Sequence, residues 1–268
     1  MKLSSNLIRQ KAETYWNEKI GKMGETPELP IITKHNLASS DFYQKKIFLD
    51  EMQWKEFCNV AQENNITPSI LVMSALVEVI GLWSSVKKFS INATLFNRPQ
   101  VVDDINNVVE DFTDVNVLSV SLDYNLSYIE RIKKMQNDMW ADMEHRDFSG
   151  VEVLRKLTKE RRKNIIMPVV FTSTLGLAKE NDTTVKRNIQ YKISQTPQVY
   201  IDCQVTDENR GAKINWDVRE GVFDANVIMD MFDTFSNLIL NINEDNTVIF
   251  NKKQPLVLPT PVYNFLQK

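Results

Sequence analysis

The sequence predicts a mixed α/β chain, with strands and helices interspersed along its length. Short β-rich runs with alternating polar and apolar residues recur along the chain. Between them lie longer segments whose apolar residues repeat with helical spacing. The chain has 268 residues, of which 43% are hydrophobic, so it can bury a core for one large domain or two small ones.

The first half of the chain alternates between helices and strands. Residues 5–22 read as an amphipathic helix that Ser4 or Ser5 would cap, and the prolines near residue 30 end it. We expect a strand at 43–50 and a helix at 51–65. Thr67 as N-cap and Pro68 at the first helical position then begin a helix that is apolar on all sides and so is buried. Strands are expected at 89–96 and 115–120.

The second half contains the stretch around which the chain is organised, residues 165–205. Residues 126–144 form a helix with one apolar stripe, and Ser149 begins another helix. In the stretch itself, an apolar run ends at residues 171–174, and an alternating run follows a polar spacer. Strand alternation places Val199, Ile201, Cys203 and Val205 on one face, and Tyr200, Asp202 and Gln204 on the other.

A hairpin and a long helix complete the predicted order of elements. Residues 212–218 would pair with 199–205 through a turn at 206–211, which is rich in Asp, Asn and Gly. Residues 225–241 form an amphipathic helix. We assign residues 1–250 to one domain and residues 251–268, with three prolines, to a linker or tail.

Composition excludes several classes of function. The net charge of −3 gives no basic excess for nucleic acid or an anionic membrane, and neither a signal peptide nor a membrane span is evident, so we expect a cytoplasmic protein. Two cysteines cannot form a metal site alone and only two histidines are available to help, so we expect no metal site, and we expect Cys58 and Cys203 to be buried, inert thiols. The sequence contains no glycine-rich phosphate loop, so no nucleotide cofactor is expected.

Several short motifs follow one another along the chain: TPS with an apolar helix ending in WS at 67–84, TLFNR at 94–98, HR-x-x-SGV at 145–151, FTS at 171–173, SQTPQVxxD at 194–202 and WD at 216–217. In residues and in order they resemble the motifs of the second half of heterocyclization domains of nonribosomal peptide synthetases. One departs from the pattern: residues 110–113 read EDFT where the family usually has GDFT, so Glu110 replaces a residue that is free to take positive φ.

The resemblance implies a lobe of chloramphenicol-acetyltransferase-like fold, one sheet with flanking helices. It covers only the C-terminal half of a two-lobed domain whose substrates meet in a tunnel between the lobes. The family's Asp-x4-Asp hallmark belongs to the other lobe, which we expect another polypeptide or an upstream segment to supply. We interpret the Asp-x4-Asp from Asp142 to Asp147 as coincidental, because the family carries its HR motif at that place.

The implied activity joins a carrier-bound acyl group to a carrier-bound Cys, Ser or Thr, then closes a thiazoline or oxazoline by loss of water. Partners would be carrier proteins with their phosphopantetheine arms, and no cofactor would be bound directly. Asp202 and Thr172 match the family's catalytic pair, a carboxyl group that shuttles protons and its orienting hydroxyl. Ser194, Gln195 and Gln198 would line the tunnel floor.

Each of these assignments has an alternative. Asp202 could be a solvated hairpin residue, Thr172 a strand hydroxyl bonded to backbone, and Ser194, Gln195 and Gln198 turn-stabilising side chains. We expect His145, at a helix end, to interact with the helix dipole and to pack against its neighbours. For the chain as a whole, the alternatives are a non-catalytic module that docks carrier proteins or scaffolds a synthetase, and an ordinary amide-forming condensation lobe.

Overall fold

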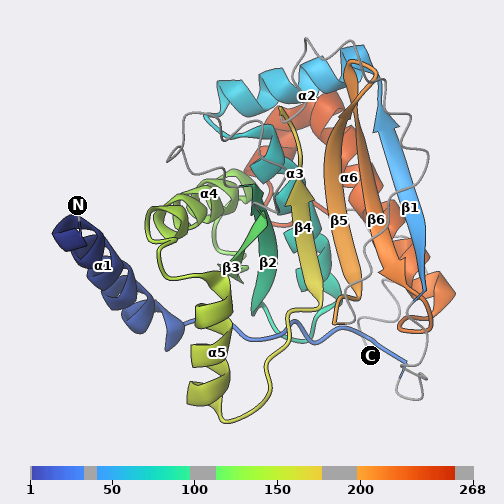
Figure 1. Cartoon of the computed structure of the whole chain (residues 1–268). Helices are drawn as coiled ribbons and strands as arrows, with labels where there is room; N and C mark the ends of the chain where they lie inside the picture. The colour runs from blue at the N-terminus through green and yellow to red at the C-terminus, as the bar shows by residue number, and fades with distance from the viewer. Residues whose placement is uncertain (1, 33–40, 97–112, 177–197, 257–268) are drawn as a thin grey trace, which may run out of the picture.

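The computed structural model describes residues 2–32, 41–96, 113–176 and 198–256. Within them one six-stranded sheet is flanked by helices (Figure 1). The strands are β1 (Phe42–Leu49), β2 (Lys88–Phe96), β3 (Thr113–Ser121), β4 (Val169–Ser173), β5 (Ile201–Glu208) and β6 (Gly211–Arg219). The helices are α1 (Lys2–Ile20), α2 (Glu51–Glu63), α3 (Pro68–Trp83), α4 (Tyr128–Glu144), α5 (Gly150–Arg161) and α6 (Ala225–Asn251).

The sheet is mixed, which confirms the predicted fold class. Its strand order is β1-β6-β5-β4-β2-β3. The three central strands β5, β4 and β2 are parallel, and the pairs β1–β6, β6–β5 and β2–β3 are antiparallel. Parallel pairing places the ends of β4 and β5 side by side, so side chains from residues about 30 positions apart in sequence meet.

The two faces of the sheet pack against different helices. Helices α2, α3, α4 and α6 cover one face, where Ile201, Cys203 and Val205 join the main core. On the other face, α1 and α5 lie at the β3 end, and their smaller core is built around Trp16, Val117 and Leu157. Gly150 allows this close approach, because a Cβ atom there would stand 1.9 Å from the carbonyl oxygen of Val115.

Helix α3 is the buried centre of the main core. The Thr67 hydroxyl accepts a hydrogen bond from the backbone N–H of Ile70 at 3.3 Å, and Pro68 occupies the first turn, as predicted. Most of the helix is buried, including Glu78. Among the described residues no single helix has the length and apolarity to span a membrane; only the pair α2 and α3, bent by 92°, passes that test together.

Three predicted details differ in the structure. Helix α1 already begins at Lys2, so Ser4 and Ser5 lie inside it and do not cap it. The β5–β6 hairpin turns at Asn209 and Arg210 alone, because both take positive φ, the geometry of a two-residue turn whose twist matches the strands. Helix α6 continues ten residues past the expected 241, with a break in helical geometry at Asp245.

The tail prediction falls partly outside the described residues. α6 ends at Asn251, the carbonyl of Lys252 accepts a hydrogen bond from the backbone N–H of Tyr128, and Leu256 is buried. Residues 257–268 are not described. The boundary between a domain ending at 250 and a tail at 251–268 stays a prediction.

Candidate functional site

A row of polar side chains crosses five strands on the sheet face opposite the main core. Strand alternation turns these residues to one face, while their apolar neighbours point into the core. The register places them in line: Thr94 lies opposite Thr172, Thr172 opposite Gln204, and Asp202 opposite Asp217. We call this set the polar row; it consists of Gln44, Thr94, Thr172, Asp202, Gln204, Asn215 and Asp217.

The predicted pair of Thr172 and Asp202 is in contact. The Oγ1 atom of Thr172 lies 3.1 Å from Oδ1 of Asp202, and 3.2 Å from Oγ1 of Thr94. The Thr172 hydroxyl is placed to donate to either neighbour, and because it carries a single proton it donates to one of them at a time. The three side chains are thus in contact from β2 through β4 to β5.

Gln204 holds the other oxygen of Asp202. Its Nε2 atom donates to Oδ2 of Asp202 at 2.8 Å and to Oδ2 of Asp217 at 3.1 Å, so one amide group bridges two carboxylates. Asp217 also accepts hydrogen bonds at Oδ1 from Asn215 (3.0 Å) and from Gln44 (2.8 Å). Three side-chain amides therefore fix Asp217, and Gln204 connects it to Asp202.

Burial distinguishes the two carboxylates in the middle of the polar row from the threonines at its β2 end. Asp202 is 5% exposed and Asp217 is fully buried, whereas Thr94 and Thr172 are half-buried. The interpretation of Asp202 as a solvated hairpin residue is therefore wrong, and Thr172 does bond to side chains. Buried carboxylates require hydrogen-bond partners, and both have them here.

A second feature lies at the strand ends near Thr94, on the helix-covered face of the sheet opposite the polar row. A cavity of about 250 Å³ sits between the ends of β2 and β4 and the helices α3 and α4. Most of its lining is apolar, including Met73, Met139 and Trp140, and Thr94 belongs to both the cavity and the polar row. Ligands in sheets with parallel strands commonly bind at such strand ends.

The other predicted site residues are not brought into the polar row. Gln198 is exposed, just before β5, and Ser194 and Gln195 lie outside the described residues. His145 ends α4, stacks on the Tyr15 ring at 4.0 Å, and its Nδ1 lies 2.7 Å from the carbonyl oxygen of Ala141, so its contacts are structural. In the described part of the chain no group of His, Cys, Asp and Glu side chains is arranged to hold a metal ion.

The two cysteines differ from each other. Cys203 is fully buried in the main core on the face opposite Asp202, and burial raises the pKa of its thiol. Cys58 is only half-buried, which corrects the expectation that both are buried, although partial burial raises the pKa of its thiol as well. A thiol with a raised pKa is a poor nucleophile at neutral pH, so neither residue is poised for covalent chemistry.

Asp142, the first residue of the Asp-x4-Asp sequence, has a structural role. It is buried and binds the Lys19 ammonium and the Tyr15 hydroxyl, with Asn116 close by at 3.5 Å. Burial raises the pKa of its carboxyl group, and these partners oppose the shift. The carboxylate therefore connects α1 to α4 and is not part of the polar row.

Comparison with known proteins agrees with this geometry. The family described as Condensation domain matches residues 3–254. Pyochelin synthetase PchF of Pseudomonas aeruginosa is 35% identical over 233 residues, which cover 86% of this chain and 13% of that protein. Bacitracin synthase 1 of Bacillus licheniformis is 34% identical over a match that covers 86% of this chain and 4% of that protein. Phenyloxazoline synthase MbtB of Mycobacterium tuberculosis is 32% identical over a match that covers 84% of this chain and 16% of that protein.

Solved structures lead to the same family. The EpoB cyclization-docking bidomain from Sorangium cellulosum superposes with a TM-score of 0.80 at 28% identity, covering 89% of this chain and 49% of that one. The nonribosomal peptide synthetase FmoA3 gives the same TM-score and identity over a match that covers 92% of this chain and 27% of that one. The chain thus spans less than a fifth of the curated relatives described above. The chain belongs to the condensation domain family of nonribosomal peptide synthetases, with cyclization domains among its similar structures.

Proposed function

We propose that this chain is the part of a heterocyclization domain that supplies the proton-transfer groups for ring closure. The acyl donor and the acceptor Cys, Ser or Thr would both arrive as thioesters on the phosphopantetheine arms of carrier proteins. A lobe with the Asp-x4-Asp motif, from another chain or segment, would complete the tunnel. The name of the relative phenyloxazoline synthase MbtB refers to an oxazoline, a ring of this class.

Ring closure requires two proton movements after the amide has formed. The acceptor side chain attacks the amide carbonyl and loses its proton, which leaves a ring carbon that bears a hydroxyl group. That hydroxyl departs as water once it has been protonated, while the ring nitrogen gives up its proton and the C=N bond forms. One positioned carboxyl group can serve both steps, taking the proton from nitrogen and delivering it to oxygen.

The observation that carries the proposal is the fixed, buried carboxyl group of Asp202. Thr172 holds Oδ1 and Gln204 holds Oδ2, so the group cannot rotate freely. At 5% exposure it is largely removed from water, which favours proton exchange with a bound substrate over exchange with solvent. The half-buried Thr94 and Thr172 form the side from which a substrate would approach.

Asp217 and its amide partners would position the proton-transfer group. Asp217 fixes the Gln204 amide, and that amide in turn fixes Asp202. We assign Asp202 the catalytic role and Thr172 the orienting role. Gln204 and Asp217 are positioning residues. Ser194, Gln195 and Gln198 remain our proposal for the substrate-binding tunnel floor.

The test separates ring formation from amide formation in the synthetase that contains this chain. With acyl- and cysteinyl-carrier proteins as substrates, Asp202→Asn is expected to suppress the ring by roughly 10²-fold or more while linear amide still accumulates. Thr172→Val is expected to have the same effect more weakly, because it removes only the orienting partner. Mass spectrometry distinguishes the products, since the ring is lighter by one water.

The matched control is Asp233→Asn, which makes the same change in charge at an exposed position on α6. It is expected to leave the ratio of ring to amide unchanged. Undiminished ring formation in the Asp202 variant would refute the assignment and leave the docking or scaffold role as the better account. Loss of both products together would show that Asp202 acts before ring closure, in amide formation or in folding.

A further inference from the structure

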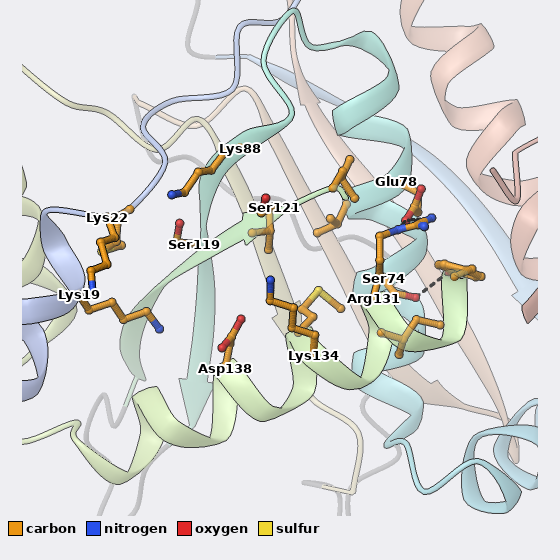
Figure 2. Close-up of a pocket in the computed structure, with 17 residues that line it drawn as sticks. Lys19, Lys22, Ser74, Glu78, Lys88, Ser119, Ser121, Arg131, Lys134 and Asp138 are labelled. Atoms are coloured by element: carbon orange, nitrogen blue, oxygen red, sulfur yellow. Dashed lines mark hydrogen bonds and ion pairs between the residues drawn. The ribbon is translucent and has the colours of Figure 1, made fainter. Parts of the chain in front are cut away.

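A second, larger cavity lies away from the polar row. Its volume is about 400 Å³, within the range of small-molecule sites, and it lies between α1, α3, α4 and the edge strand β3 (Figure 2). None of its lining residues belongs to the polar row. What it binds is therefore a separate question from ring closure.

Basic side chains dominate the lining. Four lysines and one arginine line the cavity, against two carboxylates. Figure 2 shows Lys19, Lys22 and Lys88 at one end beside Ser119, with Lys134 reaching in from α4. Lys19 is already bound to Asp142. Lys22, Lys88 and Lys134 have no ion-pair partner among the described residues. The Asp138 carboxylate lies at the same end (Figure 2), so three unpaired lysines outnumber one carboxylate and this end keeps a net positive charge.

The opposite end carries a buried polar group that lacks a partner. Glu78 on α3 is 1% exposed and its Oε1 atom lies 2.7 Å from Nη2 of Arg131. Its other carboxylate oxygen, Oε2, has no hydrogen-bond partner in the described part of the chain. A buried acceptor of this kind costs free energy unless a donor reaches it. Both Glu78 and Arg131 line the cavity.

The walls between the two ends are apolar. Side chains from four parts of the chain contribute to them, which makes a continuous hydrophobic surface between the lysines and Glu78: Met23, Val77, Val120, Leu122, Ile132 and Met135. A ligand that matches all three parts would have an anionic head, an apolar body and a hydrogen-bond donor at its far end.

We propose that this cavity binds a small organic anion of that kind, a carboxylate or phosphate monoester with an aliphatic body and a terminal hydroxyl or amide donor. The anionic head lies among Lys22, Lys88 and Lys134, where it offsets the repulsion between like charges. The body replaces water along the apolar walls. The terminal group donates a hydrogen bond to Oε2 of Glu78.

Calorimetric titration of the purified chain with four probes at pH 8, where the Glu78 carboxyl group is ionised and accepts hydrogen bonds, tests each part of this assignment. We expect 8-hydroxyoctanoate to bind more tightly than octanoate, and octanoate more tightly than octanol. Octyl phosphate reports which anionic head is preferred, and either preference is compatible with the site. No binding of any probe, or octanol binding as tightly as octanoate, overturns the anion site. Octanoate binding as tightly as its 8-hydroxy derivative overturns the contact with Glu78.

A pair of neighbouring lysines localises the binding. Lys134→Gln removes a lining ammonium, whereas Lys133→Gln removes an exposed one that does not line the cavity. Each removed contact is expected to weaken octanoate binding about three- to fivefold, and Lys88→Gln should act like Lys134→Gln. The Lys133 variant should bind like the unmodified chain. Equal affinities for the Lys133 and Lys134 variants would show that general charge, not this cavity, attracts the probe.

Discussion

Replacing Glu78 by glutamine is expected to change how the stability of the chain depends on pH. Glu78 is buried on α3 beside Arg131. Burial raises its pKa from 4.5 to about 7, although the ion pair with Arg131 opposes the shift. In the unfolded chain the same group titrates near its ordinary value.

The direction in which stability changes with pH follows from how many protons Glu78 binds in the folded and unfolded chains. Between the two pKa values the folded chain holds the proton and the unfolded chain does not, so stability falls as pH rises through this window. Below 4.5 both states are protonated and the full stability is present. Each pKa unit corresponds to about 1.4 kcal/mol, so the loss between pH 5 and pH 8 is about 2.5 kcal/mol.

Urea denaturation of the two proteins at several pH values measures this effect. Glutamine keeps the size of the side chain but does not titrate, so other ionisable groups cancel in the difference between the two proteins. The free energy of unfolding of the Glu78→Gln variant, relative to the unmodified chain, should rise by about 2.5 kcal/mol from pH 5 to pH 8. A difference that stays constant over this range would refute the reasoning.

Three further outcomes are expected. Cys203→Ala should reduce the free energy of unfolding in urea by about 1–2 kcal/mol through a small cavity, and should leave the ratio of ring to amide unchanged, because Cys203 faces the core. Arg210→Gly should raise the midpoint of thermal unfolding, because residue 210 has a left-handed backbone conformation that costs a residue with a Cβ atom about 1 kcal/mol and costs glycine little. An unchanged or lower midpoint would contradict this. The chain alone should form neither amide nor ring with carrier-bound substrates, and adding a protein with the Asp-x4-Asp lobe should restore both; turnover by the chain alone would show a self-contained site.

The sequence predicted the part of the site that depends on local pattern. Alternation placed Asp202 and Gln204 on one strand face, and the motifs identified Thr172. The hydrogen bond between Thr172 and Asp202 bears out their placement together. Most element positions were also predictable, because capping residues such as Thr67 and apolar periodicity act within a few residues.

The β6 residues of the polar row were missed because their position beside Gln204 depends on register. Asp217 was seen only as part of a WD motif, although the alternation of residues 213, 215 and 217 placed them on a polar face. Which β6 residue lies opposite Asp202 is fixed by the two-residue turn at Asn209 and Arg210, whereas a turn across 206–211 was predicted. A predicted turn of that length leaves the register undetermined.

The lysine-lined cavity was beyond sequence reasoning for a different reason. Lys22, Lys88 and Lys134 come from three distant parts of the chain, and each is an unremarkable exposed residue in its local pattern. In α1, Leu7 and Ile8 are about half exposed, although the first helix is predicted to be amphipathic. Its buried apolar residues begin at Ala12, and Arg9 forms an ion pair with Glu152 of α5.

The polar row makes the chemistry of Asp202 conditional on correct strand assembly. Its members come from β1, β2, β4, β5 and β6, and successive side chains on a strand point to opposite faces. If β1 paired one residue out of step, Gln44 would turn toward the core and Asp217 would lose one of its three amide donors. A misassembled sheet would therefore carry every residue of the proposed site in its sequence and still lack the proposed proton shuttle, so ring formation in the presence of the Asp-x4-Asp lobe would report on correct refolding.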